Sequence, residues 1–114
     1  MTAEQFRRMA LSFPGAAEGA HMQHPDFRLH GKIFATLGYP DSGWGMVKLT
    51  PRQQEKFVRH EPTSFSPASG AWGRGGSTIV CLKMTKVALL REAMTDAWRN
   101  AASKAAPTRT SARR

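Results

Sequence analysis

The sequence FSPASGAWGRGGSTIVCLKM, residues 65–84 of this 114-residue chain, indicates how the rest of the protein folds. Four glycines, at positions 70, 73, 75 and 76, surround Trp72 and Arg74 and precede the most strand-like run of the chain, Ser77 to Lys83. Glycine adopts positive φ values and lets other groups approach the backbone, which residues with a Cβ tolerate poorly. The stretch therefore predicts a glycine-rich loop that leads into a strand.

The strand after the glycines is expected to lie inside a sheet. Thr78, Val80 and Leu82 alternate with Ile79 and Cys81, so apolar groups occupy both faces, as in a strand that is covered on both sides. Cys81, the single cysteine, would then be a small buried hydrophobe without the access that a thiolate nucleophile requires.

Helix signals lie on both sides of this stretch. The pattern Thr-x-x-Gln at residues 2–5 predicts a capping box and a first helix. The same pattern at residues 50–53, with proline in the second position, predicts a short second helix. An apolar stripe over residues 87–101 predicts a long closing helix, which Thr85 can cap and which fades after about Lys104.

A tight hairpin is predicted between the first two helices. Strand-like residues 26–29 and 32–37 flank His30-Gly31, where both positions can take the positive φ of a type I′ turn. In this register Phe27 lies opposite Phe34, and Leu29 lies opposite Lys32. With a further strand over residues 44–49, the chain is expected to be α+β. Its antiparallel sheet would have about five strands, accompanied by a first helix, a short helix and a long C-terminal helix.

The basic character of the chain is unevenly distributed. The formal net charge is +9, but residues 1–98 hold 12 Lys and Arg against all 8 acids, which leaves only +4 there. We therefore expect one domain over residues 1–104 and a disordered basic tail over residues 105–114. The sequence begins without a signal-peptide pattern and contains no long apolar run, which predicts a cytoplasmic protein without a membrane partner.

Five short motifs make the sequence similar to the MmcQ/YjbR family of small bacterial proteins. They read HPDFR, GKIFA, KLT, FSPA followed by WGR, and a closing segment that contains Trp98, at residues 24–28, 31–35, 48–50, 65–74 and 93–102. The resemblance implies a compact α+β domain that is often compared with the frataxin-like fold, and a DNA-binding function. Many members carry an Asn-Lys-x-His-Trp segment after the loop, where this sequence has AWGRGG at residues 71–76, so any role of that Asn and His does not transfer.

Metal binding is not expected. Frataxin-like proteins bind iron through an acidic helix, whereas the first helix here carries only Glu4 beside Arg7 and Arg8. The cluster of His21, His24 and Asp26 offers metal-ligand side chains, but residues three apart in a strand point to opposite faces unless the chain bends sharply. The sequence favours His24 as a turn residue that bonds the backbone before a proline.

An enzymatic function is not predicted either. The sequence contains no Gly-x-Ser-x-Gly elbow, and its acids are scattered through the loops without the spacing of an acid and base pair. The glycine-rich segment lacks the Gly-Lys-Ser/Thr of a phosphate loop and precedes a strand instead of a helix. We therefore expect a non-enzyme without a cofactor.

The candidate site is a nucleic-acid surface in which basic and aromatic side chains share one face of the sheet. Such groups neutralise phosphates and stack on bases. A lone tryptophan beside a glycine turn more often packs into the space that the glycines leave, which is the competing interpretation for both Trp44 and Trp72. The candidate binding residues are Arg28, Lys32, Lys48, Trp72 and Arg74, with the basic tail.

Two functions follow from these residues. The first is weak, sequence-independent DNA binding through the basic and aromatic face. The alternative is a small-ligand or protein-interaction module without catalysis, in which the segment from Phe65 to Gly76 lines a cleft.

Overall fold

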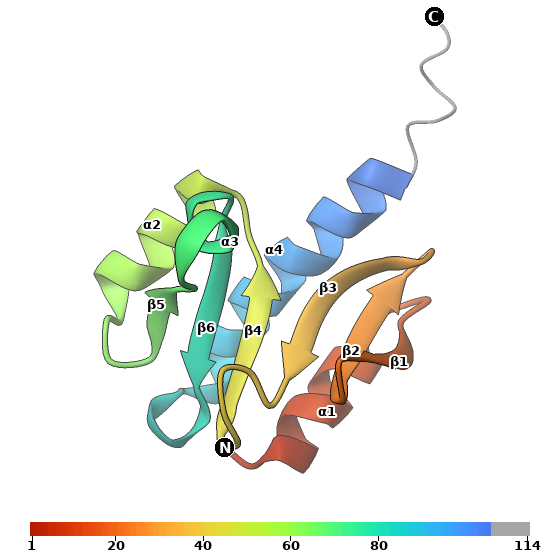
Figure 1. Cartoon of the computed structure of the whole chain (residues 1–114), viewed down its shortest axis with the longest axis horizontal. Helices are drawn as coiled ribbons and strands as arrows, with labels where there is room; N and C mark the ends of the chain where they lie inside the picture. Colours follow the sequence, from red (N-terminus) through yellow and green to blue (C-terminus); the bar gives the residue numbers. More distant parts are fainter. Residues whose placement is uncertain (106–114) are drawn as a thin grey trace, which may run out of the picture.

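The computed structural model describes residues 1–105 as one antiparallel sheet with helices packed against it (Figure 1). Six strands lie in the order β1-β2-β3-β4-β6-β5, which confirms the expected α+β class with one strand more than the estimate of about five. The strands are β1 (Ala17–His21), β2 (His24–Leu29), β3 (Lys32–Leu37), β4 (Trp44–Lys48), β5 (Phe65–Pro67) and β6 (Ser77–Cys81). The helices are α1 (Ala3–Leu11), α2 (Pro51–His60), α3 (Gly70–Arg74), the 3-10 turn η1 (Leu82–Met84) and α4 (Val87–Ala105).

The two faces of the sheet are covered differently. Helices α1, α2 and α4 pack on one face; Figure 1 shows α4 running behind the strands and α3 in front of β6. Aromatic and aliphatic side chains fill the space under the three longer helices, and the largest fully buried ones are Phe6, Phe27, Phe34, Phe57, Phe65, Leu90 and Met94. Of the described helices, only the short α3 lies on the second face, which we call the open face. Alternation along the paired strands places Asp26, Thr36, Met46 and Ile79 on it.

The predicted hairpin is present, with one difference in register. His30 and Gly31 both have positive φ, and Leu29 pairs with Lys32 as expected. Phe27 pairs with Ala35 instead of Phe34, because the register shifts between Phe27 and Arg28. The irregularity allows Phe27 and Phe34 both to be fully buried although they are not cross-strand partners.

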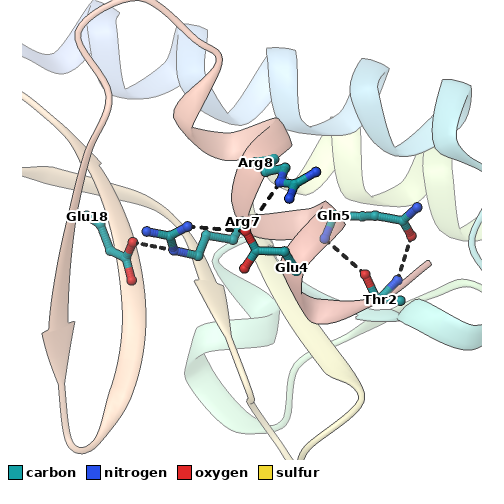
Figure 2. Close-up of polar contacts among 6 residues, drawn as sticks. All are labelled: Thr2, Glu4, Gln5, Arg7, Arg8 and Glu18. Carbon is teal, nitrogen blue, oxygen red and sulfur yellow. Dashed lines mark hydrogen bonds and ion pairs between the residues drawn. The ribbon is translucent and has the colours of Figure 1, made fainter.

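The N-terminal helix and the edge strand β1 are joined by one ion pair, between Arg7 and Glu18 (Figure 2). The capping box between Thr2 and Gln5 is formed, as the sequence predicts. Arg7 donates to Glu18 of β1 at 2.7 Å and also contacts Glu4, which Arg8 reaches at 3.3 Å. Strand β1 was not expected from the sequence, because its residues Ala-Glu-Gly-Ala-His carry no strand-like apolar pattern.

The residues of the glycine-rich segment are more ordered than the loop that the sequence predicts. They contain β5, which pairs with β6, and the five-residue helix α3. Strand β6 is interior, as predicted, but it is not covered on both sides: Ile79 and Cys81 point to the open face and are half-exposed. The prediction of a fully buried cysteine is therefore wrong, because no described helix covers that end of the strand.

The closing helix α4 begins at Val87 and packs through Leu90, Met94, Ala97 and Ala101, in agreement with the predicted stripe. Thr85 does not cap it; its hydroxyl donates to the Cys81 carbonyl. The sequence predicts a disordered tail over residues 105–114. The structure describes only the first of these, Ala105, as the last residue of α4; the others lie outside the described residues. Within residues 1–105, every helix is too short or too polar to cross a lipid bilayer.

Gly76 is expected to be required for this fold. Its φ is +114°, and a Cβ there would lie 1.9 Å from the carbonyl oxygen of Leu49. We expect Gly76→Ala to lower the free energy of unfolding by about 2 kcal/mol or more, because backbone atoms must move. Gly75→Ala is the matched control, since its φ is −83° and its Cβ would meet nothing nearer than 3.5 Å. Urea unfolding of both variants tests this, and equal losses would contradict it.

Candidate functional site

A groove opens where β3 and β4 separate toward one end of the sheet. The two strands pair only from Ala35 to Leu37 on β3 and from Gly45 to Val47 on β4, so residues nearer the hairpin diverge from β4. The groove has a volume of about 740 Å³ and draws its walls from β3, β4, α3 and α4. Its principal lining residues are Lys32, Ile33, Lys48, Trp72, Ala97 and Asn100.

The groove is positively charged. Lys32 and Lys48 are both exposed, and neither forms an ion pair with any residue in the described part of the chain. By contrast, Arg7, Arg8 and Arg59 each contact a glutamate. The two lysines therefore present uncompensated charge to whatever enters the groove.

Trp72 forms an exposed aromatic wall of this groove. Its residue surface is 58% exposed, so packing into the glycine space, the competing interpretation, is wrong for this tryptophan. Trp44 is half-buried at the start of β4 and does not line the groove. The sequence pattern alone could not separate the two cases, because both tryptophans adjoin glycine turns.

Close backbone contacts hold α3 and its tryptophan in place. A Cβ on Gly73 would lie 1.7 Å from the Ala68 carbonyl oxygen, so only glycine fits there. The Gln54 side chain of α2 donates to the carbonyl oxygens of Gly73 at 3.0 Å and Ser77 at 2.9 Å. Trp72 is thus exposed on a segment whose backbone is fixed on both sides.

Asn100 is a groove residue that the sequence did not single out. Its amide donates to the Lys48 carbonyl oxygen at 3.2 Å and to Gln53 Oε1 at 2.8 Å, which ties α4 to the end of β4 and the start of α2. A polar residue in the last turns of an otherwise apolar helix stripe was the available signal. The sequence predicts Gln53 as part of a capping box, and this role does not indicate that Gln53 also contacts Asn100.

A second polar group lies on the open face near the sheet edge. Asp26 is fully buried and accepts hydrogen bonds from Arg28 Nε and the Arg28 Nη2 at 2.7 and 3.0 Å, and it contacts His21 Nδ1 at 2.7 Å. The Arg28 bonds hold the pKa of the Asp26 carboxyl below its usual value; burial opposes this shift and His21 adds to it. Arg28 is therefore charge-compensated, although its side chain is 37% exposed.

The turn between His21 and His24 contradicts the expectation that these two histidines, three residues apart, point to opposite faces of the sheet. Met22 and Gln23 have φ of 49° and 68° and form a two-residue turn, so the two histidines are cross-strand partners on one face. His24 is the first residue of β2, and its expected role as a turn residue is wrong. Among residues 1–105, no three His, Cys, Asp or Glu side chains are placed to hold a metal ion together.

Comparison with known proteins identifies the family of this chain. The YjbR family model matches residues 11–100. The chain belongs to the YjbR family. A similar solved structure is the crystal structure of Deinococcus radiodurans protein DR2400, with the family-model domain DUF419: the TM-score is 0.75 at 16% identity, over 91% of this chain and 80% of that one. No curated protein matches the chain.

The candidate residues of this YjbR-family protein separate into three groups. Lys32, Lys48 and Trp72 line the same groove, but Lys32 pairs with the buried Leu29 and so lies on the helix-covered side of the sheet instead of sharing the open face. Arg28 lies on the same sheet but is bound to Asp26. Arg74 is exposed at the end of α3 and does not line the groove, and the tail lies outside the described residues.

Acid titration tests the Asp26 cluster of this YjbR-family protein. Because the folded pKa lies below the usual value, ionised Asp26 stabilises the fold above about pH 4, and this contribution is lost as the pH falls through the lowered pKa. Asp26→Asn should be less stable than the wild type at neutral pH, with the difference shrinking in acid. Urea unfolding at several pH values measures it, and Asp41→Asn, at an exposed turn, is the control. A difference that stays constant with pH would contradict the assignment.

Proposed function

We infer that this YjbR-family protein binds DNA weakly and without sequence preference, through the groove between β3, β4, α3 and α4. The observation that carries the inference is the combination of two lysines that form no ion pair within residues 1–105 and one largely exposed indole around a single groove. Lysines supply the counterion-releasing contacts that dominate sequence-independent binding. An exposed indole adds stacking, worth about 1–3 kcal/mol per base.

Each groove residue has a distinct role in this proposal. Lys32, on the hairpin, and Lys48, at the end of β4, bind phosphates from two sides of the groove. Trp72 contacts a base or sugar between them, and Asn100 fixes the backbone that carries Lys48. Arg28 is left out of the primary contacts because a buried carboxylate already binds it.

The groove assignment predicts a charge effect that depends on position. Lys48→Glu should weaken binding to a fluorescent oligonucleotide about tenfold or more at low salt, and the slope of log affinity against log salt should fall by about one. Lys83→Glu makes the same change in net charge at an exposed site beyond the opposite end of β6 and is the matched control. Anisotropy titrations at two or more salt concentrations measure both variants.

Two results would contradict this assignment. One is an affinity that does not respond to salt in the wild-type protein. The other is an equal loss in Lys48→Glu and Lys83→Glu, because net charge and not the groove would then determine binding.

The second candidate function uses the same groove. The segment from Phe65 to Gly76 contributes Ala71, Trp72 and Gly75 to its lining, and a volume of about 740 Å³ is in the range of small-ligand sites. A non-catalytic small-ligand or protein-interaction role therefore stands beside DNA binding. A thermal-shift screen separates the two: a metabolite that stabilises the fold while DNA does not would favour the small ligand.

A further inference from the structure

Four rings form a continuous row across the open face of the sheet. His21 of β1 contacts His24 of β2 with ring centroids 6.5 Å apart, and His24 contacts Tyr39, in the β3–β4 connection, at 6.2 Å. Tyr39 in turn contacts Trp72 of α3 at 5.9 Å. All three contacts are edge-to-face, with interplanar angles between 66° and 83°. We call these four residues the ring row.

The ring row is partly exposed to solvent, and a buried carboxylate holds the ring at one end of it. Trp72 is exposed, and the other three rings are half-buried, so each keeps part of its surface open to solvent. His21 is fixed by its contact with the buried Asp26 carboxylate. Thr36, the cross-strand partner of Asp26, is also buried on this face, and its hydroxyl has no hydrogen-bond partner in the described residues.

The ring row joins the groove at one end and a cation at the other. Trp72 belongs to both the row and the groove, beside Lys48. At the far end, Arg28 and His21 share the Asp26 carboxylate, and the Arg28 side chain is partly exposed. A linear ligand that leaves the groove past Trp72 would therefore meet rings in succession and then a guanidinium.

We propose that the ligand is single-stranded DNA, and that its bases stack along the ring row after the strand leaves the groove. This proposal rests on the DNA-binding function inferred above and names its substrate class. In a duplex the bases are already paired and stacked on one another, so rings on a sheet surface cannot reach their faces. Unpaired bases stack on aromatic side chains irrespective of sequence, which matches a site that has rings and cations but few directed polar groups.

Oligothymidylates of increasing length test the ring row in the full-length protein. Affinity should rise with length beyond the dinucleotide that the groove holds and should level off once the strand covers the ring row, within the ~4–16 nucleotides per fold of single-strand binding sites. Tyr39→Leu should weaken binding of an oligomer of about eight nucleotides tenfold or more, but should leave a dinucleotide, held by the groove, nearly unchanged. Tyr39→Phe keeps the ring and should retain the wild-type affinity.

Matched controls separate stacking from unfolding. His24→Ala removes a ring of the row, whereas His60→Ala removes an exposed histidine of α2 from outside it. Only His24→Ala should weaken binding of the longer oligomer. Melting temperatures of all variants report folding. In the wild-type protein, 2-aminopurine placed along the strand should be quenched at successive positions, which needs no variant.

Three results would overturn the proposal. Unchanged affinity of Tyr39→Leu for the longer oligomer, with binding still lost in Lys48→Glu, would exclude the ring row and leave the groove intact. A duplex of the same sequence that binds as tightly as the single strand would exclude the substrate class. Absence of binding to every oligonucleotide would overturn the DNA-binding function itself, and the ring row with it.

Discussion

Close packing of the backbone around Gly73 and Gly76 is the constraint on which the candidate site depends. At both positions a Cβ would overlap a carbonyl oxygen, of Ala68 in one case and of Leu49 in the other. Without these contacts α3 could not lie against the sheet, and Trp72 would not reach the groove. Because these glycines have no side chains, the short helix α3 can pack closely enough for its exposed tryptophan to line the groove.

Local patterns in the sequence were sufficient for much of the fold. Both Thr-x-x-Gln capping boxes, the His30-Gly31 turn and the buried stripe of α4 depend on contacts within a few residues, and the structure has all of them. Strand β1 escaped prediction because it is ordered by tertiary contacts, chiefly the Arg7–Glu18 pair and its ladder with β2. Likewise, the register shift beside Phe27 reflects a need to bury two phenylalanines that no local pattern expresses.

The sequence indicates which residues belong to the candidate site better than it indicates how they are arranged in space. The sequence indicates Lys32, Lys48 and Trp72 as basic or aromatic groups near turns, and the divergence of β3 from β4 brings them to one groove. The sequence could not reveal that Arg28 is bound by the buried Asp26, because this depends on which face of a strand is covered. Nor could spacing place His21 opposite His24, since two non-glycine residues adopt positive φ between them.

The attachment of α3 has a consequence for how such a domain can diversify. Its backbone is held by glycines and by the Gln54 amide, so Ala71, Trp72 and Arg74 contribute little to holding the segment in position. These three side chains can therefore be exchanged while the supporting sheet is left undisturbed. If the groove binds a ligand as proposed, substitutions at these three positions would change what it binds and leave the fold intact.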